Sequence, residues 1–305
     1  MLIVQLVHMT ADQVSSFEFV SIPQFFCAMT HSLSESENAL VGITAGIVDI
    51  SCIQWAYYLK NARQQRLPLT WNPRILYRGY VANCANVAAG TSFQFATAGA
   101  LKKVVLCGEH RELTDAEKVC TGFLAGFASG VMATPLELVM TQQQLKGGSA
   151  LQNARSLPPS TVLRGCFPTC TREGLFTAAY LGVAPVLRAH LSSAFPGTNE
   201  ELHRMLAALA GAACSGILSH PFDTAKTCMQ GDIERKTYGS FAQTCREIYS
   251  SGGGFRGFYR GLEFRFLRQV WQVWVLDLLR VKLSPLLFPY RFKADANLSL
   301  DFAIA

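Results

Sequence analysis

Six apolar stretches separated by polar connectors dominate the hydropathy pattern of the chain. Each is about 20 residues or longer, the length that an α-helix needs to cross the hydrocarbon core of a bilayer. The pattern therefore predicts an all-α membrane protein with six transmembrane helices. The expected spans lie near residues 35–62, 80–104, 115–143, 168–190, 199–228 and 262–284.

The composition supports a membrane protein and weakens other classes. Of the 305 residues, 50% are hydrophobic and 16% are charged, whereas an ordinary soluble domain carries about 25% charged residues. A disordered chain is excluded and a soluble enzyme is disfavoured. The ten cysteines and six histidines show no metal-ligand spacing, and no catalytic or cofactor motif stands out. We therefore expect no enzyme activity, no cofactor and no metal.

Two landmarks recur three times along the chain and indicate tandem repeats. The first is an S/T-x-x-E capping box, which marks a helix start, followed by two small residues spaced four apart, which let helices approach closely. The second is a turn that ends in Arg-Gly. The capping pairs are Ser34 with Glu37, Thr114 with Glu117, and Thr198 with Glu201; the small pairs are Gly42 with Gly46, Gly122 with Gly126, and Ala208 with Ala212; the turns end at Gly79, Gly165 and Gly261.

Each repeat holds two of the six spans, so the chain divides into three pseudo-symmetric parts. The expected boundaries are 34–107 for the first repeat, 108–193 for the second and 194–285 for the third. An N-terminal extension, 1–33, and a C-terminal tail, 286–305, lie outside this pattern.

A motif near the end of the first span of each repeat carries the resemblance to a known family. Its full form, P-x-(D/E)-x-x-(K/R), is complete in the third repeat; the second lacks the base, and the first lacks the proline and the acid. Together with the Arg-Gly turns and the threefold period, this pattern resembles the mitochondrial carrier family, as a divergent member, over residues 34 to about 285. The aligned positions are Trp55, Tyr57 and Lys60; Pro135, Glu137 and Met140; and Pro221, Asp223 and Lys226.

The resemblance implies a gate on the matrix side, where the acid of each odd helix pairs with the base of the next. The third implied pair lacks both charges at once, so no buried charge is left uncompensated, which would cost roughly 3–5 kcal/mol. A glutamine after each motif would brace the gate, and the prolines would kink their helices. The implied pairs are Glu137 with Lys226, Asp223 with Lys60, and Tyr57 with Met140; the braces are Gln64, Gln144 and Gln230; the kinks lie at Pro135 and Pro221.

The resemblance also implies solute contact points seven residues beyond each turn glycine. These positions hold Asn86, Arg172 with Glu173 beside it, and Arg268. Arginine binds carboxylates through paired hydrogen bonds, so Arg172 and Glu173 together suit a zwitterion, as in the amino-acid-type carriers. Two alternatives stay open: Arg172 pairs with Glu173 or a neighbouring helix, and Arg268 neutralises a nearby carboxylate.

Asp49 is an acid inside the first expected span. It precedes Lys60 by eleven residues, which places it about 20° away around the helix and three turns further along. An intramembrane acid is a functional candidate by default, so we expect Asp49 near the solute. The alternative is a local pair with a base such as Lys102.

Connector charges predict the topology. Connectors 61–79 and 144–165 contain bases and no acid, whereas 103–118 and 190–204 are acidic or mixed. Basic loops mark the side that is not translocated, which for a protein resembling carriers is the matrix. Both termini would then face the intermembrane space, in the mitochondrial inner membrane, and the net charge of +6 needs no nucleic acid. No Lys or Arg precedes Lys60, so we expect no cleavable presequence.

Two functions fit this pattern. The first is a transporter that moves a small carboxylate-bearing, amino-acid-like metabolite by alternating access. The second is a carrier fold reused as a non-transporting structural subunit of an inner-membrane complex, such as a respiratory one. It is suggested by the bulky Trp271 and Trp274 and by missing acids late in the even spans, where the resemblance implies a second, outer gate. The expected partners are the solute, the lipid bilayer with cardiolipin as a candidate at matrix-side helix N-termini, and, for the second function, neighbouring subunits bound through both termini.

Overall fold

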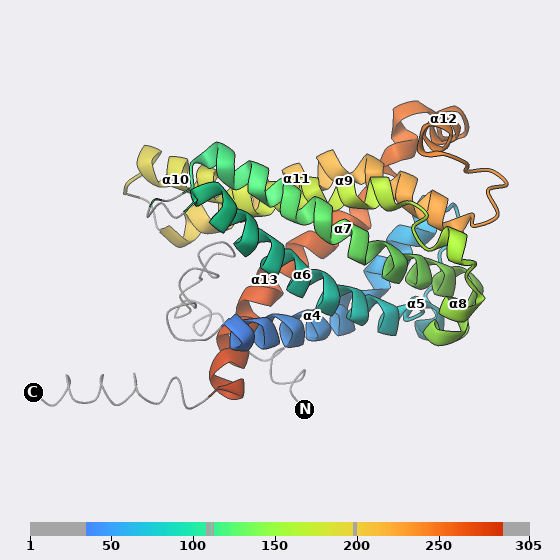
Figure 1. Ribbon diagram of the computed structural model, residues 1–305, viewed down its shortest axis with the longest axis horizontal. Coiled ribbons are helices and arrows are strands. Elements are labelled where there is room, and N and C mark those ends of the chain that lie inside the picture. Colours follow the sequence, from blue (N-terminus) through green and yellow to red (C-terminus); the bar gives the residue numbers. More distant parts are fainter. Residues whose placement is uncertain (1–34, 108–110, 112, 198–199, 289–305) are drawn as a thin grey trace, which may run out of the picture.

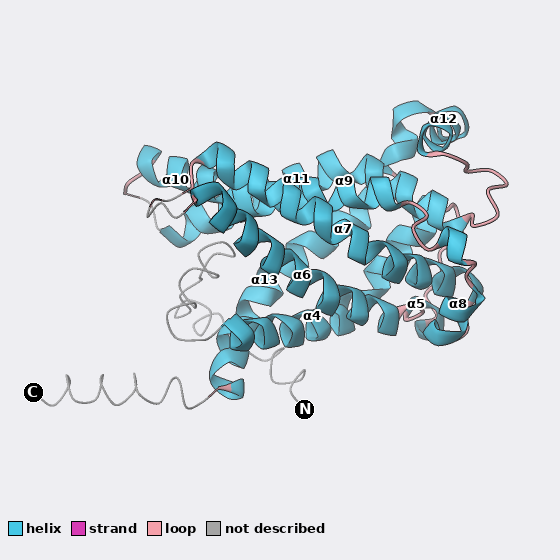
Figure 2. Cartoon of the chain, viewed as in Figure 1, coloured by secondary structure: helices cyan, strands magenta, loops and turns pink. Residues whose placement is uncertain are grey.

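The regular elements of the described chain are all helical (Figures 1 and 2). The computed structural model describes residues 35–107, 111, 113–197 and 200–288. Six long helical segments follow the six expected spans within a few residues at most ends, which confirms the predicted all-α class. They are α4 Glu35–Gln64, α6 Tyr80–Leu106, α7 Asp115–Lys146, α9 Cys166–Thr177 continued by η3 Ala178–Val183 and α10 Ala184–Ala194, α11 Glu200–Gly231, and α13 Leu262–Leu287.

These segments form a closed ring. Each packs against the next in chain order, from α4 to α6, α7, α9 and α11, and α13 packs against both α11 and α4. We call α4 with α6 the first helix pair, α7 with α9 and α10 the second, and α11 with α13 the third. Side chains that point to the middle of the ring therefore come from all three pairs.

In the described chain, the odd helices are the ones whose hydropathy reaches that of a membrane span. Within the described residues, three helices are long and apolar enough to cross a membrane by themselves: Leu40–Gln64, Asp115–Lys146 and Met205–Gly231. The even segments do not reach that level, and α13 carries Glu263, Arg265 and Arg268 in its first two turns. The ring explains how such a helix is accommodated, because Arg265 and Arg268 turn inward and are removed from lipid, whereas Glu263 is exposed in the first turn.

Helix starts agree with the sequence where the structure describes them. Thr114 and Glu117 form the predicted capping box of α7: the Thr114 backbone N–H donates to Glu117 Oε2 at 2.8 Å, and the Glu117 N–H to Thr114 Oγ1 at 3.4 Å. The pairs that begin at Ser34 and Thr198 lie outside the described residues. Gly79, Gly165 and Gly261 all have a φ near +80° directly before α6, α9 and α13, a conformation that favours glycine.

Close helix approach accounts for some of the small residues on α7 and α4. A Cβ on Gly130 of α7 would lie 2.5 Å from Cys170 Cα of α9, and a Cβ on Gly126 would overlap the Glu173 carbonyl oxygen. In α4, a Cβ on Gly46 would lie 2.7 Å from Val87 Cγ1, but one on Gly42 would meet nothing within 4 Å. The predicted small-residue contact is therefore present for Gly46 and absent for Gly42.

Short helices gather at one end of the ring, which we call the connector end (Figure 1). They lie in the three long connectors between odd and even segments, while α10 lies at the opposite end. The short elements are α5 Pro73–Leu76, α8 Ala150–Ser156, η2 Pro159–Thr161, α12 Phe241–Gly252 and η4 Gly254–Tyr259.

The long helices contain two kinds of irregularity: internal prolines and one π-helical segment. Pro135 and Pro221 lie inside α7 and α11, which continue as helices on both sides. The fourth span was expected to be one helix, but its middle, η3, is π-helical. A π-helical turn holds one residue more than an α-helical turn, and such segments occur often at functional sites.

Candidate functional site

A group of ionisable side chains lies buried or half-buried inside the ring, toward the connector end. Its members come from α4, α7, α9, α11 and α13, and we call it the central charge cluster. Five bases stand against four acids, so the cluster carries one positive charge in excess. The bases are Lys60, Arg172, Lys226, Arg265 and Arg268; the acids are Asp49, Glu137, Glu173 and Asp223.

Two lysines bridge different helix pairs. Lys60 Nζ of α4 lies 2.7 Å from Asp223 Oδ2 of α11, and Lys226 Nζ of α11 lies 3.1 Å from Glu137 Oε2 of α7. Both bridges are buried. The structure thus brings together the two charged pairs that the sequence implied.

Arg172 of α9 is occupied by carboxylates of the protein itself. Its Nη2 donates to Glu137 Oε1 at 2.7 Å and to Glu173 Oε1 at 2.5 Å. Its Nε lies 3.6 Å from Asp223 Oδ1. The geometry agrees with the alternative in which Arg172 pairs with Glu173 and a neighbouring helix, rather than with a guanidinium left open for a solute carboxylate.

Arg265 of α13 is a member that the sequence analysis missed. It is 3% exposed, its Nη2 donates to Ser219 Oγ at 2.5 Å, and its Nη1 lies 3.4 Å from Asp223 Oδ2. It does not belong to the repeated landmarks, because the matching positions hold Asn83 and Thr169. A count of intramembrane bases would have found it, since it precedes Arg268 by one turn.

Arg268 is held by neutral groups. Its Nη1 donates to the Tyr57 hydroxyl at 3.0 Å and to Gln272 Oε1 at 2.9 Å, and its Cζ lies 4.8 Å from the centroid of the Tyr57 ring. These are its hydrogen-bond partners within the described part of the chain. Arg268 is therefore the cluster guanidinium whose charge is least compensated by a direct carboxylate contact.

Tyr57 and Met140, the third implied pair, each have contacts with other residues. Tyr57 turns to Arg268, and Met140 lies against the turn before α6, where a Cβ on Gly79 would come 2.9 Å from Met140 Cγ. The physical reason is that a phenol offers a guanidinium both a hydrogen-bond acceptor and a π-face, whereas a thioether offers neither strongly.

Asp49 and Asn86 lie in the same interior. Asp49 is 2% exposed and interacts electrostatically with Arg268, while Lys102 is exposed. One side-chain oxygen of each, Oδ1, is buried and has no hydrogen-bond partner among the described residues. The alternative of a local pair between Asp49 and Lys102 does not fit this burial.

The three glutamines differ in what they touch. Gln64 Nε2 donates to Asp223 Oδ2 at 2.9 Å, so it contacts the Lys60 bridge directly. Gln144 instead accepts from Asn61 Nδ2 at 2.6 Å, and Gln230 accepts from Thr141 Oγ1 at 3.3 Å. Gln64 therefore makes a bracing contact with an ion pair, and the other two tie helices together through neutral groups.

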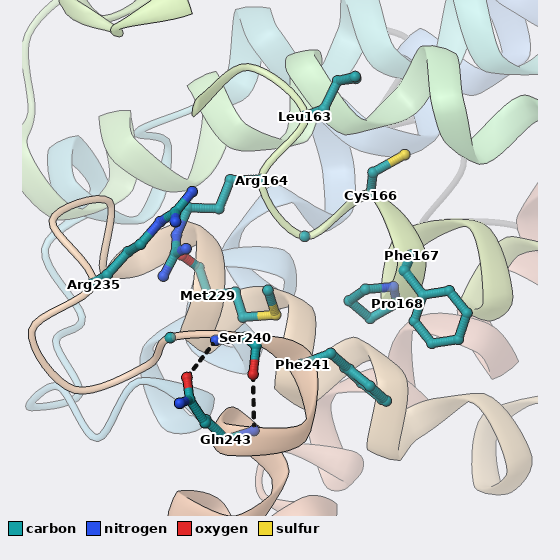
Figure 3. A pocket seen from close by; sticks show the side chains of 12 residues that line it. Leu163, Arg164, Cys166, Phe167, Pro168, Met229, Arg235, Ser240, Phe241 and Gln243 are labelled. Carbon is teal, nitrogen blue, oxygen red and sulfur yellow. Dashed lines mark hydrogen bonds between the residues drawn. The ribbon is translucent and has the colours of Figure 1, made fainter. Parts of the chain in front are cut away.

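A separate pocket of about 640 Å³ opens at the connector end, between the first turns of α9 and α12 (Figure 3). Arg164 and Arg235 line one side of it, and Phe167, Pro168 and Phe241 line the other. Arg164 is 7% exposed and donates through Nε to the Met229 carbonyl at 2.5 Å. The rings of Phe167 and Phe241 meet edge to face, with centroids 5.1 Å apart. The remaining lining residues are Leu163, Gly165, Cys166, Met229, Gly239, Ser240 and Gln243.

A ring of three tandem helix pairs with ion pairs between them defines a polytopic helical membrane protein. The chain belongs to the mitochondrial carrier family: residues 111–195 and 197–279 match the family described as mitochondrial carrier protein. The six-helix, three-part layout is characteristic of this family. Membership implies a multi-pass protein of the mitochondrial inner membrane.

Several curated relatives are transporters by name. The chain is 27% identical over 173 residues to the mitochondrial carnitine carrier of Saccharomyces cerevisiae, covering 53% of this chain and 52% of that protein. It is 26% identical over 223 residues to solute carrier family 25 member 33 of Bos taurus, covering 65% and 66%. It is 29% identical over 157 residues to the mitochondrial glycine transporter of Candida glabrata, covering 46% and 52%. The alignments thus span between about half and two thirds of these relatives.

Proposed function

We propose that the protein is a solute transporter that moves a small carboxylate-bearing metabolite across the inner membrane by alternating access. The observation that carries this proposal is Arg268, a half-buried guanidinium inside the ring whose hydrogen bonds go to Tyr57 and Gln272. Such a group is ready to take a carboxylate in paired hydrogen bonds. Two yeast relatives are named for carnitine and for glycine, which are both small molecules with a carboxylate.

Asp49 refines the proposed solute. Its buried carboxylate interacts with Arg268 and lies near the indole of Trp271, but its Oδ1 makes no hydrogen bond of ordinary geometry among the described residues. An ammonium group on the same solute would supply a donor. The proposed solute is therefore an amino-acid-like zwitterion bound between Arg268 and Asp49, with Asn86 as a further candidate contact, in place of the arrangement around Arg172 and Glu173 that the sequence alone favoured.

Uptake into liposomes that contain the purified protein tests this function. Radiolabelled amino acids and short carboxylates without an amino group are compared in the wild type, Arg268→Gln and Asp49→Asn. We expect saturable uptake that is lost in Arg268→Gln, whereas Asp49→Asn loses amino acids more than plain carboxylates. Arg256→Gln is the matched control, because Arg256 is exposed at the connector end.

The other function remains an outcome of this experiment. Uptake that is unchanged in Arg268→Gln would remove Arg268 from the solute site. Absence of uptake for every solute, from a folded protein that migrates in a large native complex, would instead favour a structural subunit of an inner-membrane assembly.

The proposed orientation puts the connector end in the matrix and both termini in the intermembrane space. Its support is the basic character of the connectors that carry α5 and α8, which hold no acid between residues 61–79 and 144–165. Labelling of a cysteine placed at Arg155 with a membrane-impermeant thiol reagent tests it, in intact mitochondria and in inverted inner-membrane vesicles. The signal is the labelling beyond that of the wild type, whose own exposed cysteines also react. This signal is expected in the inverted vesicles alone.

An anionic lipid, with cardiolipin as the candidate, is the proposed occupant of the pocket in Figure 3. The pocket combines the guanidinium groups of Arg164 and Arg235 with an aromatic wall. It also faces the N-terminus of α9, whose N-cap Gly165 provides no side-chain cap, and helix N-termini favour phosphate groups.

Lipid-dependent thermal unfolding tests this site. Cardiolipin should raise the midpoint of the wild type more than phosphatidylcholine does, and Arg235→Gln should reduce that gain. Arg246→Gln, a substitution of an exposed arginine on α12, should keep it. An equal gain in all three proteins would exclude this pocket.

A further inference from the structure

Both acids that bridge helix pairs have a second base from their own pair. Glu137 of α7 contacts Lys226 of the third pair and Arg172 of its own, second pair. Asp223 of α11 contacts Lys60 of the first pair and Arg265 of its own, third pair. In each case a lysine reaches across the interface and an arginine of the acid's own pair contacts the same acid. Arg172 Nε also lies 3.6 Å from Asp223 Oδ1 across the interface, which is longer than the Lys60 and Arg265 contacts of that acid.

The arginines are fixed to the same pair by further contacts. Arg265 also donates to Ser219 Oγ, and Ser219 lies four residues before Asp223, on the same face of α11. Arg172 also donates to Glu173 on its own helix. A movement that separates whole helix pairs would stretch the two lysine bridges and leave these arginine contacts in place.

The different placement of the lysines and the arginines matters for the buried carboxylates of Glu137 and Asp223. Removing one member of a buried ion pair is strongly destabilising, because the other charge stays buried without compensation. We propose that Arg172 and Arg265 are resident counter-ions, positioning residues that keep Glu137 and Asp223 compensated whenever the lysine bridges part. The interfaces between the pairs are thereby held by bridges that can open without exposing a bare carboxylate to the protein interior.

The inference rests on the proposed function only because transport is the reason for the lysine bridges to open. The compensation of Asp223 by two bases can be measured without any solute. Thermal unfolding of the purified full chain in detergent is compared in the wild type, Lys60→Gln, Arg265→Gln and the double variant. We expect each single variant to lower the midpoint by about 3 °C and the double variant to lower it by on the order of 10 °C, more than the sum.

Two further variants separate charge compensation from packing. Arg265→Lys in the Lys60→Gln background should keep the midpoint of Lys60→Gln, because a positive charge still meets Asp223. Adding Asp223→Asn to the double variant should restore most of the lost midpoint, because no carboxylate is left to compensate. If the double variant yields no folded protein, recovery of folded protein by Asp223→Asn is the same result.

The matched control is an ion pair on the surface between α4 and α13, the helices that carry Lys60 and Arg265. Arg63 of α4 lies 3.6 Å from Glu263 of α13, and both side chains are more than half exposed. Arg63→Gln should change the midpoint by less than about 2 °C. Additive effects of Lys60→Gln and Arg265→Gln, a full loss in Lys60→Gln alone, or no rescue by Asp223→Asn would each overturn the inference. Because the unfolding midpoints do not depend on transport, they test the inference even if the protein transports no solute.

Discussion

Tyr57 of α4 contacts Arg268 of α13 through both the face of its ring and its hydroxyl, and so joins the first and third helix pairs. The guanidinium lies over the ring, with Cζ 4.8 Å from its centroid, and donates to the hydroxyl at 3.0 Å. Tyr57 occupies the position that holds the acid Glu137 or Asp223 in the other pairs. A phenol in place of a carboxylate holds the arginine without neutralising its charge.

The first prediction concerns this substitution. Tyr57→Glu should place a carboxylate beside Arg268 and compete with the solute, so the KM for carboxylate uptake should rise at least about tenfold, as expected for a hydrogen bond to a charged group. Tyr57→Phe keeps the π-face and should change KM much less. A proteoliposome assay with both variants checks this, and an unchanged KM in Tyr57→Glu would contradict it.

The second prediction concerns the close contact of α7 with α9. Gly130→Ala should destabilise the protein by about 1–3 kcal/mol, because the added methyl group would overlap the backbone of Cys170. Gly42→Ala, on an open face of α4, should be neutral or stabilise by roughly 0.5–1 kcal/mol. Thermal unfolding of the two variants in the same detergent tests this difference. Equal midpoints would contradict the close contact between Gly130 and Cys170.

The third prediction concerns the glutamine that touches an ion pair. Gln64→Ala removes a hydrogen bond to Asp223, and a bond to a charged group is worth about 1.5–3 kcal/mol. The unfolding midpoint should fall by about 5 °C. Gln152→Ala, at an exposed position of α8, serves as the control, and a Gln64→Ala midpoint within 1 °C of that control, a margin of under about 1 kcal/mol, would exclude a bracing role.

The fourth prediction concerns pH and the loop after α11. Partial burial alone would raise the pKa of Asp232, but the backbone N–H groups of Tyr238, Thr237 and Lys236 outweigh it and hold the pKa below its usual value. The carboxylate therefore stabilises the fold above the unfolded-state pKa of about 3.9. This contribution is lost as the pH falls through the lower, folded-state pKa.

Asp232→Asn tests that contribution. At pH 7 the variant should be less stable than the wild type, and the difference should shrink when unfolding is measured at progressively lower pH, below about 4. Asp115→Asn is a suitable comparison, because Asp115 is exposed at the other end of the ring. A difference that stays constant with pH would show that the three N–H groups do not favour the charged form.

Periodic features made the fold predictable from sequence. The capping box at Thr114 and Glu117 predicted the start of α7 to the residue. The expected starts of α6 and α13 were also correct, whereas α9 begins at Cys166, two residues before the expected position. The π-helical segment Ala178–Val183 was not predictable in this way. It changes the hydrogen-bond partner of each backbone group without changing the apolar pattern of the residues.

The site was predictable only as far as the repeats are alike. The bridges of Lys60 and Lys226 follow from aligned positions. The partners of Arg172 depend on how closely α7 and α9 approach, which the glycines permit but do not specify. Arg265 has no charged counterpart in the other repeats, where Asn83 and Thr169 stand, so comparison of the repeats does not reveal it.

The π-helical segment also limits how far the three helix pairs can be treated as copies. One extra residue in a turn rotates everything that follows by roughly 100° around the helix axis. Residues of α10 therefore point in other directions than an uninterrupted helix from Cys166 would give them. Equivalent numbering between the even helices loses its spatial meaning beyond Thr177, so positions in α10 cannot be compared one for one with the later turns of α6 and α13.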